Sequence, residues 1–190
     1  MAKAAKKADA TKPARNDAFL NGSTSYPWVS VTPEAHASRL SLRAPRASLG
    51  ALSQALDLEL PTRPKTSVTK GKRAALWLGP DEWLLIGPAK DDLMAALSQV
   101  EAFHSAVEIS HRNVAFLVAG REAEATLAAG CPQDLSLAAF PVGACSRTVF
   151  GKVEVILWRT GEDAFRVECW RSFSDYTLTL LREAARDAAA

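Results

Sequence analysis

The spacing of apolar residues changes several times along the first half of the chain. Leu40 and Leu42 alternate with polar neighbours, which is typical of a strand with one buried face. Leucines then recur at helical spacing behind Ser48. Two apolar runs, 74–78 and 83–87, flank a Gly-Pro-Asp-Glu turn and indicate a hairpin. The folded part is thus expected to contain, from about Ser38, a strand, a helix with Leu49, Leu52 and Leu56 on one face, an exposed connection over 57–73, a hairpin, and a helix capped by Asp91 or Asp92.

The second half contains a run that is apolar on both faces. Because of this composition, Val114–Ala119 is expected to form a central, covered strand. A helix over 121–129 ends at Gly130, and Pro132 follows it. Further strands are expected over 146–150, 153–158 and 165–170.

The last strand and the last helix carry the clearest facial patterns. In 165–170, alternation places Phe165, Val167 and Cys169 inward and Arg166 and Glu168 toward water. A final helix opens at Ser172, with Asp175 as a weak capping box. Its expected apolar stripe consists of Phe173, Tyr176, Leu180, Leu181 and Ala184.

The order strand, helix, strand, strand, helix therefore occurs twice. The segments that begin at Leu76 and Leu157 match in character: each has Leu-Trp, a turn with paired acids, an aromatic residue, an apolar strand and a helix. We predict an α+β fold of two pseudo-repeated β-α-β-β-α units with mainly antiparallel sheet. With 190 residues and 48% hydrophobic content, the chain fits a single domain, expected over residues 26–190.

Residues 1–25 differ from the rest and predict a flexible basic arm. Five cations and one anion lie within residues 1–15, so the net charge of +2 is a property of this arm, and the remainder is about −2. The remainder shows no Lys/Arg stripe interleaved with aromatic residues, which favours a solvated or partner-docking arm over nucleic-acid binding. Tyr26 and Trp28, beside Pro27, are the first hydrophobic anchors and our candidates for partner contact.

The sequence also bears on the compartment. No apolar run approaches the ~20 residues of a membrane-spanning helix, and the N-terminus lacks the apolar region of a secretory signal. Three cysteines with wide spacing argue against a disulfide framework or a structural zinc site. We therefore expect a cytoplasmic protein that contacts no membrane.

Few residues suggest chemistry of their own. The carboxylate pairs Asp81-Glu82 and Glu162-Asp163 lie in predicted turns, where acids commonly satisfy local backbone donors, although paired acids also serve acid–base catalysis.

Ser110-His111, with Glu108 nearby, suggests a triad, but adjacent strand residues point to opposite faces, and no G-x-S-x-G elbow is present. His36 and His104 show no metal-ligand spacing.

Cysteine and glycine patterns point the same way. Cys131, before Pro132, is interpreted as a buried small hydrophobe rather than a reactive thiol. The sequence has neither G-x-G-x-x-G after a strand nor G-x-x-x-x-G-K-[ST]. We therefore expect no catalytic, cofactor-binding or metal-binding residues forming a complete site in this chain.

Several stretches resemble the gamma subunit of heterotetrameric sarcosine oxidase over about residues 38–182. They are LWLGPDEWLLIG (76–87), VEISHRNVAFLVAG (107–120), AAGCPQDLSLAAFPVGACSRTVFGKVEVILWR (128–159) and VECWRSFSDYTLTLL (167–181). A looser resemblance extends to the folate-dependent aminomethyltransferase of the glycine cleavage system. Glu108-Ile109-Ser110-His111 and Thr160-Gly161-Glu162 carry it, and it implies an aminomethyltransferase folate-domain-like fold with Glu162 as a weak folate candidate.

The gamma-subunit resemblance implies a non-catalytic structural subunit. The complex would demethylate sarcosine oxidatively to glycine and hydrogen peroxide and pass the one-carbon unit to tetrahydrofolate. FAD, FMN, NAD, tetrahydrofolate and zinc would belong to the partner chains, the alpha, beta and delta subunits. The alternative is a free-standing folate-binding or aminomethyltransferase-like protein.

Overall fold

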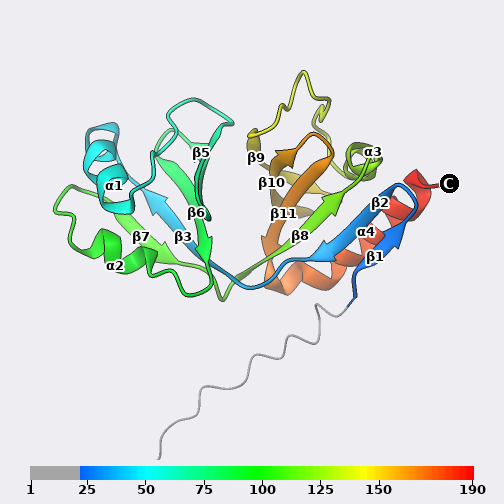
Figure 1. Ribbon diagram of the computed structural model, residues 1–190, viewed down its shortest axis with the longest axis horizontal. Coiled ribbons are helices and arrows are strands. Elements are labelled where there is room, and N and C mark those ends of the chain that lie inside the picture. The colour runs from blue at the N-terminus through cyan, green and yellow to red at the C-terminus, as the bar shows by residue number, and fades with distance from the viewer. Residues whose placement is uncertain (1–21) are drawn as a thin grey trace, which may run out of the picture.

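The computed structural model describes residues 22–190 and shows two antiparallel sheets that face each other, with helices on their outer sides (Figure 1). Residues 1–21 of the predicted arm lie outside the described residues. Residues 22–25 of that arm are described, and strand β1 (Thr24–Tyr26) begins two residues before residue 26, the expected start of the domain. Within the described range, no helix is long and apolar enough to cross a bilayer.

One sheet has six strands in the order β1-β2-β8-β11-β10-β9. Strand β8 is one of its two central strands, as its apolar faces predict, and it pairs with β2 on one side and β11 on the other. The strands after β1 are β2 (Val29–Pro33), β8 (Asn113–Ala119), β9 (Cys145–Phe150), β10 (Val153–Gly161) and β11 (Ala164–Trp170).

The other sheet has five strands in the order β4-β5-β6-β3-β7. The predicted hairpin is confirmed as β5 and β6, with a register shift between Trp77 and Gly79 where the chain turns. The strands are β3 (Ala37–Arg43), β4 (Ser67–Lys70), β5 (Arg73–Gly79), β6 (Glu82–Pro88) and β7 (Ser105–Glu108).

The helices form where the sequence predicts them, with some ends shifted. Short 3-10 turns, η2 (Arg46–Ser48) and η3 (Arg171–Phe173), precede α1 (Leu49–Leu56) and α4 (Ser174–Ala188). The carboxylate of Asp92 accepts a hydrogen bond from the Ala95 amide and caps α2 (Leu93–Ser98). Helix α3 is shorter than expected (Ala123–Ala128).

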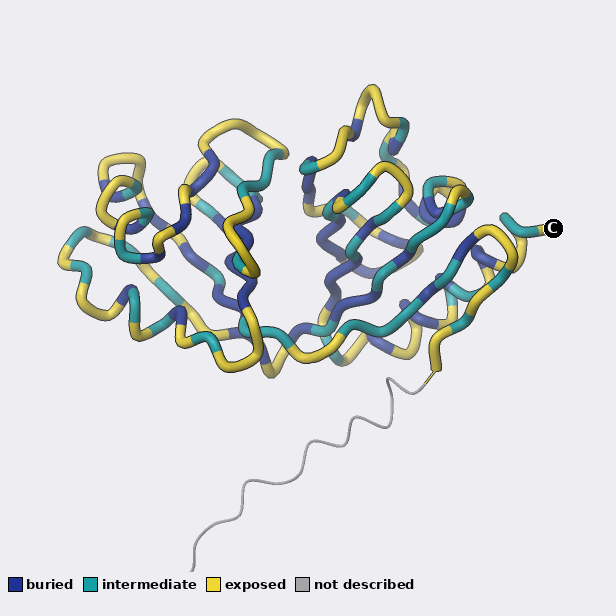
Figure 2. Tube along the Cα trace, viewed as in Figure 1, coloured by how far each residue is buried: buried dark blue, intermediate teal, exposed yellow. Residues whose placement is uncertain are grey.

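Three apolar clusters hold these layers together (Figure 2). One, around Trp83, lies between the five-stranded sheet and helices α1 and α2. A second, around Phe116, Phe165 and Leu181, lies between the six-stranded sheet and helices α3 and α4. The third is smaller, includes Leu84 and Ile156, and fills the space between the sheets. Each sheet is therefore buried on both faces.

The predicted duplication is present, and its two halves exchange a strand. In each half a four-strand ladder has the same order, β3-β6-β5-β4 in one and β8-β11-β10-β9 in the other. Strand β2 precedes β3 in the chain but pairs with β8, whereas β7 precedes β8 but pairs with β3. Apart from β1, each half thus has the order β-β-α-β-β-β-α, two strands more than the predicted unit, and its first strand joins the sheet of the other half.

Three expectations are corrected. The connection 57–73 contains β4, which the sequence hides because only Val68 of its four residues packs against the core. Glu168 does not face water but is 1% exposed, because the second sheet covers this face of β11. Helix α4 buries a face that includes Thr177, Leu178 and Leu181, whereas Phe173 and Tyr176 of the predicted stripe stay exposed.

Candidate functional site

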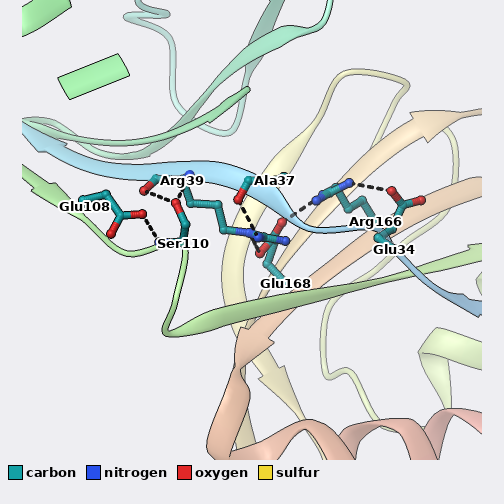
Figure 3. Close-up of polar contacts among 7 residues, drawn as sticks. All are labelled: Glu34, Ala37, Arg39, Glu108, Ser110, Arg166 and Glu168. Carbon is teal, nitrogen blue, oxygen red and sulfur yellow. Dashed lines mark hydrogen bonds and ion pairs between the residues drawn. The ribbon is translucent and has the colours of Figure 1, made fainter. Parts of the chain in front are cut away.

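The most polar part of the interior lies where the two halves connect (Figure 3). Arg39 of β3 and Glu168 of β11 form an ion pair of 2.7 Å between Nε and Oε2, and both side chains are 1% exposed. The other carboxylate oxygen of Glu168 accepts a hydrogen bond of 2.9 Å from Arg166, which also pairs with Glu34 at 3.0 Å. The chain of charges therefore joins the two sheets.

The Ser110–His111–Glu108 set lies beside this network and does not form a triad. The Ser110 hydroxyl accepts a hydrogen bond of 2.7 Å from the Arg39 amide. His111 is exposed and points its Nδ1 to Glu108 Oε2 at 3.4 Å instead. Hydrogen bonds from Ser110 hold the pKa of Glu108 below its ordinary value, and a weaker hydrogen bond from His111 acts in the same direction. Ser110 therefore positions the β3 backbone and has no base beside it, as expected, but for another reason: Ser110 and His111 lie in the turn between β7 and β8 and not on a strand.

These three residues and His36 border an open depression of about 720 Å³. It is large enough for a small ligand, but its buried polar group, Ser110, is bonded to the β3 backbone. Among the described residues that line this depression, no nucleophile lies beside a base.

The first carboxylate pair joins distant arginines rather than local backbone donors. Asp81 forms two hydrogen bonds of 3.0 and 3.1 Å with Arg43. Glu82 reaches across to the other sheet and pairs with Arg147 of β9, one contact being 3.1 Å. The turn interpretation is thus correct for the position of the pair and incomplete for the contacts of its side chains.

The second pair lies in the β10–β11 turn, where Glu162 is exposed. The Glu162 carbonyl, not its carboxylate, accepts hydrogen bonds from the buried Arg159. Arg159 also donates to the carbonyls of Leu135 and Phe140 at 2.7 and 3.0 Å and lies over the Phe165 ring. Arg159 therefore holds the loop before β9 in place, and folate binding by Glu162 stays a prediction.

A narrow cavity of about 60 Å³ lies between the sheets. Asn113, Glu154 and Glu168 are among its lining residues, and the Asn113 side-chain oxygen is buried without a partner in the described part of the chain. Ligand pockets usually have volumes of ~300 Å³ or more. The cavity is too small for a pterin or flavin ring, and its polar lining suits a few water molecules.

The three cysteines are unpaired and buried, as expected for Cys131. Burial raises the pKa of Cys145 to about 12 and that of Cys169 to about 11. These thiols stay protonated at neutral pH, which argues against nucleophilic roles. Across residues 22–190, no group of three or more His, Cys, Asp or Glu side chains is placed to hold a metal ion.

The two candidate anchors have different surroundings. Tyr26 is half-buried and packs against the core of its own chain. Trp28 is 45% exposed in the β1–β2 turn, with the Arg121 guanidinium 3.5 Å from its ring centre. Trp28 is therefore the candidate that remains accessible to a partner.

Sequence reasoning missed the buried Arg39–Glu168 pair and an exposed aromatic group at the start of α4. The only sequence signal for this pair is that a charged residue, Arg39 or Glu168, lies inside each of the two alternating strands β3 and β11. Alternation identifies the face opposite the core and does not reveal that a second sheet covers that face.

Comparison with known proteins agrees with this arrangement. Residues 43–187 match the model of the sarcosine oxidase, gamma subunit family. The sarcosine oxidase subunit gamma of Corynebacterium sp. (strain P-1) is 32% identical over 180 residues, which cover 91% of this chain and 87% of that protein. That of Corynebacterium sp. (strain U-96) is 32% identical over 169 residues, covering 85% and 82%.

Solved structures show a similar relationship. A chain of the heterotetrameric sarcosine oxidase from Corynebacterium sp. U-96 superposes with a TM-score of 0.82 at 28% identity, covering 92% of this chain and 91% of that chain. The glycine cleavage system aminomethyltransferase T from Bartonella henselae has a TM-score of 0.64 at 14% identity, with 85% of this chain and 49% of that chain covered. The second likeness shows the fold alone.

Proposed function

The chain belongs to the sarcosine oxidase gamma subunit family, and on this premise we propose that it is the non-catalytic structural subunit of a heterotetrameric sarcosine oxidase. One observation carries the proposal: the match extends over almost the whole of both chains, with a TM-score of 0.82 to a chain of such an assembly. The expected partners are the alpha, beta and delta subunits, and the expected compartment is the cytoplasm.

The polar groups of this chain support a structural role. The buried charges Arg39, Glu168 and Arg159 are engaged in contacts that hold sheets and loops together. The Ser110 hydroxyl accepts a hydrogen bond from the Arg39 amide in the backbone of β3. A residue that acts on substrate needs a free reacting atom beside a cavity, and these groups do not offer one.

The chemistry is accordingly proposed for the other subunits. These would oxidise sarcosine to glycine with formation of hydrogen peroxide and pass the one-carbon unit to tetrahydrofolate. FAD, FMN, NAD, tetrahydrofolate and zinc would be bound there. The cavity between the sheets of this chain, at about 60 Å³, does not fit any of the organic cofactors.

Coexpression tests the proposal. The chain, tagged at its exposed C-terminus, is expected to co-purify with the alpha, beta and delta subunits and with sarcosine oxidase activity. The Phe103→Ala variant is a matched control, because Phe103 is 82% exposed in the α2–β7 loop and supports no contact with the core clusters. Recovery of the tagged chain alone, while the partners assemble into an active enzyme without it, would refute the proposal.

A further inference from the structure

Helix α4 carries more apolar surface than the fold of this chain uses. Its buried face includes Leu178 and Leu181. Phe173, in the 3-10 turn η3 just before the helix, and Tyr176, in the first turn of the helix, are 39% and 41% exposed. Trp170, at the end of β11 just before the helix, is 42% exposed. Together these three residues form an exposed aromatic strip.

The strip is held in one conformation by contacts within the chain. The rings of Trp170 and Phe173 are stacked, with centroids 6.1 Å apart. The guanidinium of Arg112 lies 4.9 Å from the centre of the Trp170 ring. The Tyr176 hydroxyl accepts a hydrogen bond of 3.2 Å from the Lys152 amide. Rings fixed before binding lose little conformational entropy when a partner covers them.

The residue types are those that contribute most to binding between proteins. Tryptophan, tyrosine and arginine are enriched among the residues whose truncation weakens interfaces most. Isolated exposed apolar residues are common and carry no such meaning, whereas contiguous ones mark interaction sites. Phe103 is an isolated residue of the first kind, and the strip is of the second kind.

Charges around the strip define the partner. Arg112 and Lys152 form no ion pair with a carboxylate in residues 22–190. Two carboxylates, Asp175 and Glu183, line the same depression as Tyr176, whereas Arg112 lies against Trp170 at the other end of the strip. A partner that brings a carboxylate to Arg112 at one end of an apolar groove would complement this pattern.

We propose that Trp170, Phe173 and Tyr176 form the docking surface for one of the partner subunits of the oxidase, which presents an apolar groove with a carboxylate opposite Arg112. This inference rests on the proposed function. A second copy of this chain is a poor occupant, because a symmetric contact centred on Trp170 would bring Arg112 of both copies together and like charges oppose association.

The test uses the coexpressed complex and the double variant Trp170→Ala/Phe173→Ala. We expect its gamma chain to bind at least about 30-fold more weakly, as is typical when one major contact residue is lost, and to separate from the other subunits on dilution and size exclusion. Phe103→Ala, which also removes an exposed ring, is expected to leave binding unchanged. Arg112→Glu should weaken binding and reduce its dependence on salt.

Two further measurements guard against misinterpretation. The variant chain should retain the circular dichroism spectrum and melting temperature of the parent, since the removed rings are outside the core. In the unmodified complex, amide hydrogen exchange over 170–176 should be slower than in the free chain.

The outcomes separate this inference from the proposed function. If the unmodified chain does not assemble with the partner subunits, the proposed function is wrong. If it assembles and the double variant assembles equally well, only the docking surface is wrong. Self-association of the free chain that the double variant abolishes would also overturn it in favour of a second copy.

Discussion

Removing the buried carboxylate between the two sheets tests how this fold is held together. In Glu168→Gln, the side chain keeps its size but loses its charge. Arg39, which is 1% exposed, then faces a neutral amide instead of the carboxylate 2.7 Å away. Arg166 retains Glu34 as a partner at 3.0 Å. The substitution therefore strands one buried cation.

The expected cost follows from that stranded charge. Breaking a buried ion pair from one side typically destabilises a protein by about 3–5 kcal/mol. For a chain of this size that corresponds to a decrease in melting temperature of roughly 6–20 °C. Replacing both partners with apolar residues, Arg39→Met with Glu168→Leu, should recover much of the loss, because apolar pairs of similar volume are often neutral or better. The surroundings suit the replacement, since Ile86 lies opposite Arg39 and Ala115 lies opposite Glu168 in their ladders, and both are apolar and buried.

Urea unfolding followed by circular dichroism measures these effects. Arg43→Gln is the matched control, since it breaks the Arg43–Asp81 pair, whose side chains are 58% and 52% exposed, and exposed pairs contribute only about 0–1 kcal/mol. If Glu168→Gln costs no more than this control, or if the double variant is as unstable as the single one, the reasoning from burial is wrong.

Three other predictions concern separate groups. Burial raises the pKa of Cys145 to about 12 and that of Cys169 to about 11, above the ordinary value of 9.0. The contribution of these two thiols to stability is therefore present below about pH 9 and is lost as the pH rises through 11–12. A thiol reagent should label neither cysteine in the folded chain at about pH 8 and both after unfolding. Replacing Arg159 with Met removes its bonds to the Leu135 and Phe140 carbonyls, so amide exchange in this loop should accelerate while that of helix α1 stays unchanged; unchanged loop exchange would contradict this. Calorimetry with tetrahydrofolate is expected to give no heat, and a binding heat that Glu162→Gln abolishes would instead support the folate-binding alternative.

The local patterns of the sequence predict most elements because each depends on neighbouring residues. Helical leucine spacing identifies α1, and the turn between two apolar runs identifies the β5–β6 hairpin. Strand β2 is missed because its pairing partner is far away in the chain, with Val31 opposite Val118. The predicted face of α4 is partly wrong because two apolar stripes lie on one helix, and only packing decides which one the chain itself buries.

The site could not be predicted to the same extent. The sequence argues against a Ser110–His111 pair through strand alternation, whereas the structure places both residues in a turn and bonds Ser110 to the β3 backbone. The Arg39–Glu168 pair joins residues 129 positions apart. Such a contact depends on how two sheets meet, which no periodicity in either strand specifies.

The exchange of β2 and β7 between the halves has a consequence for how the chain unfolds and how it tolerates cleavage. A half taken alone lacks the strand that borders its longest ladder and would expose an open sheet edge, which invites aggregation. Unfolding of either half should therefore open the other, giving one cooperative transition in place of two. A break in the exposed α2–β7 loop should leave two fragments that remain associated, because each still supplies a strand that the other needs.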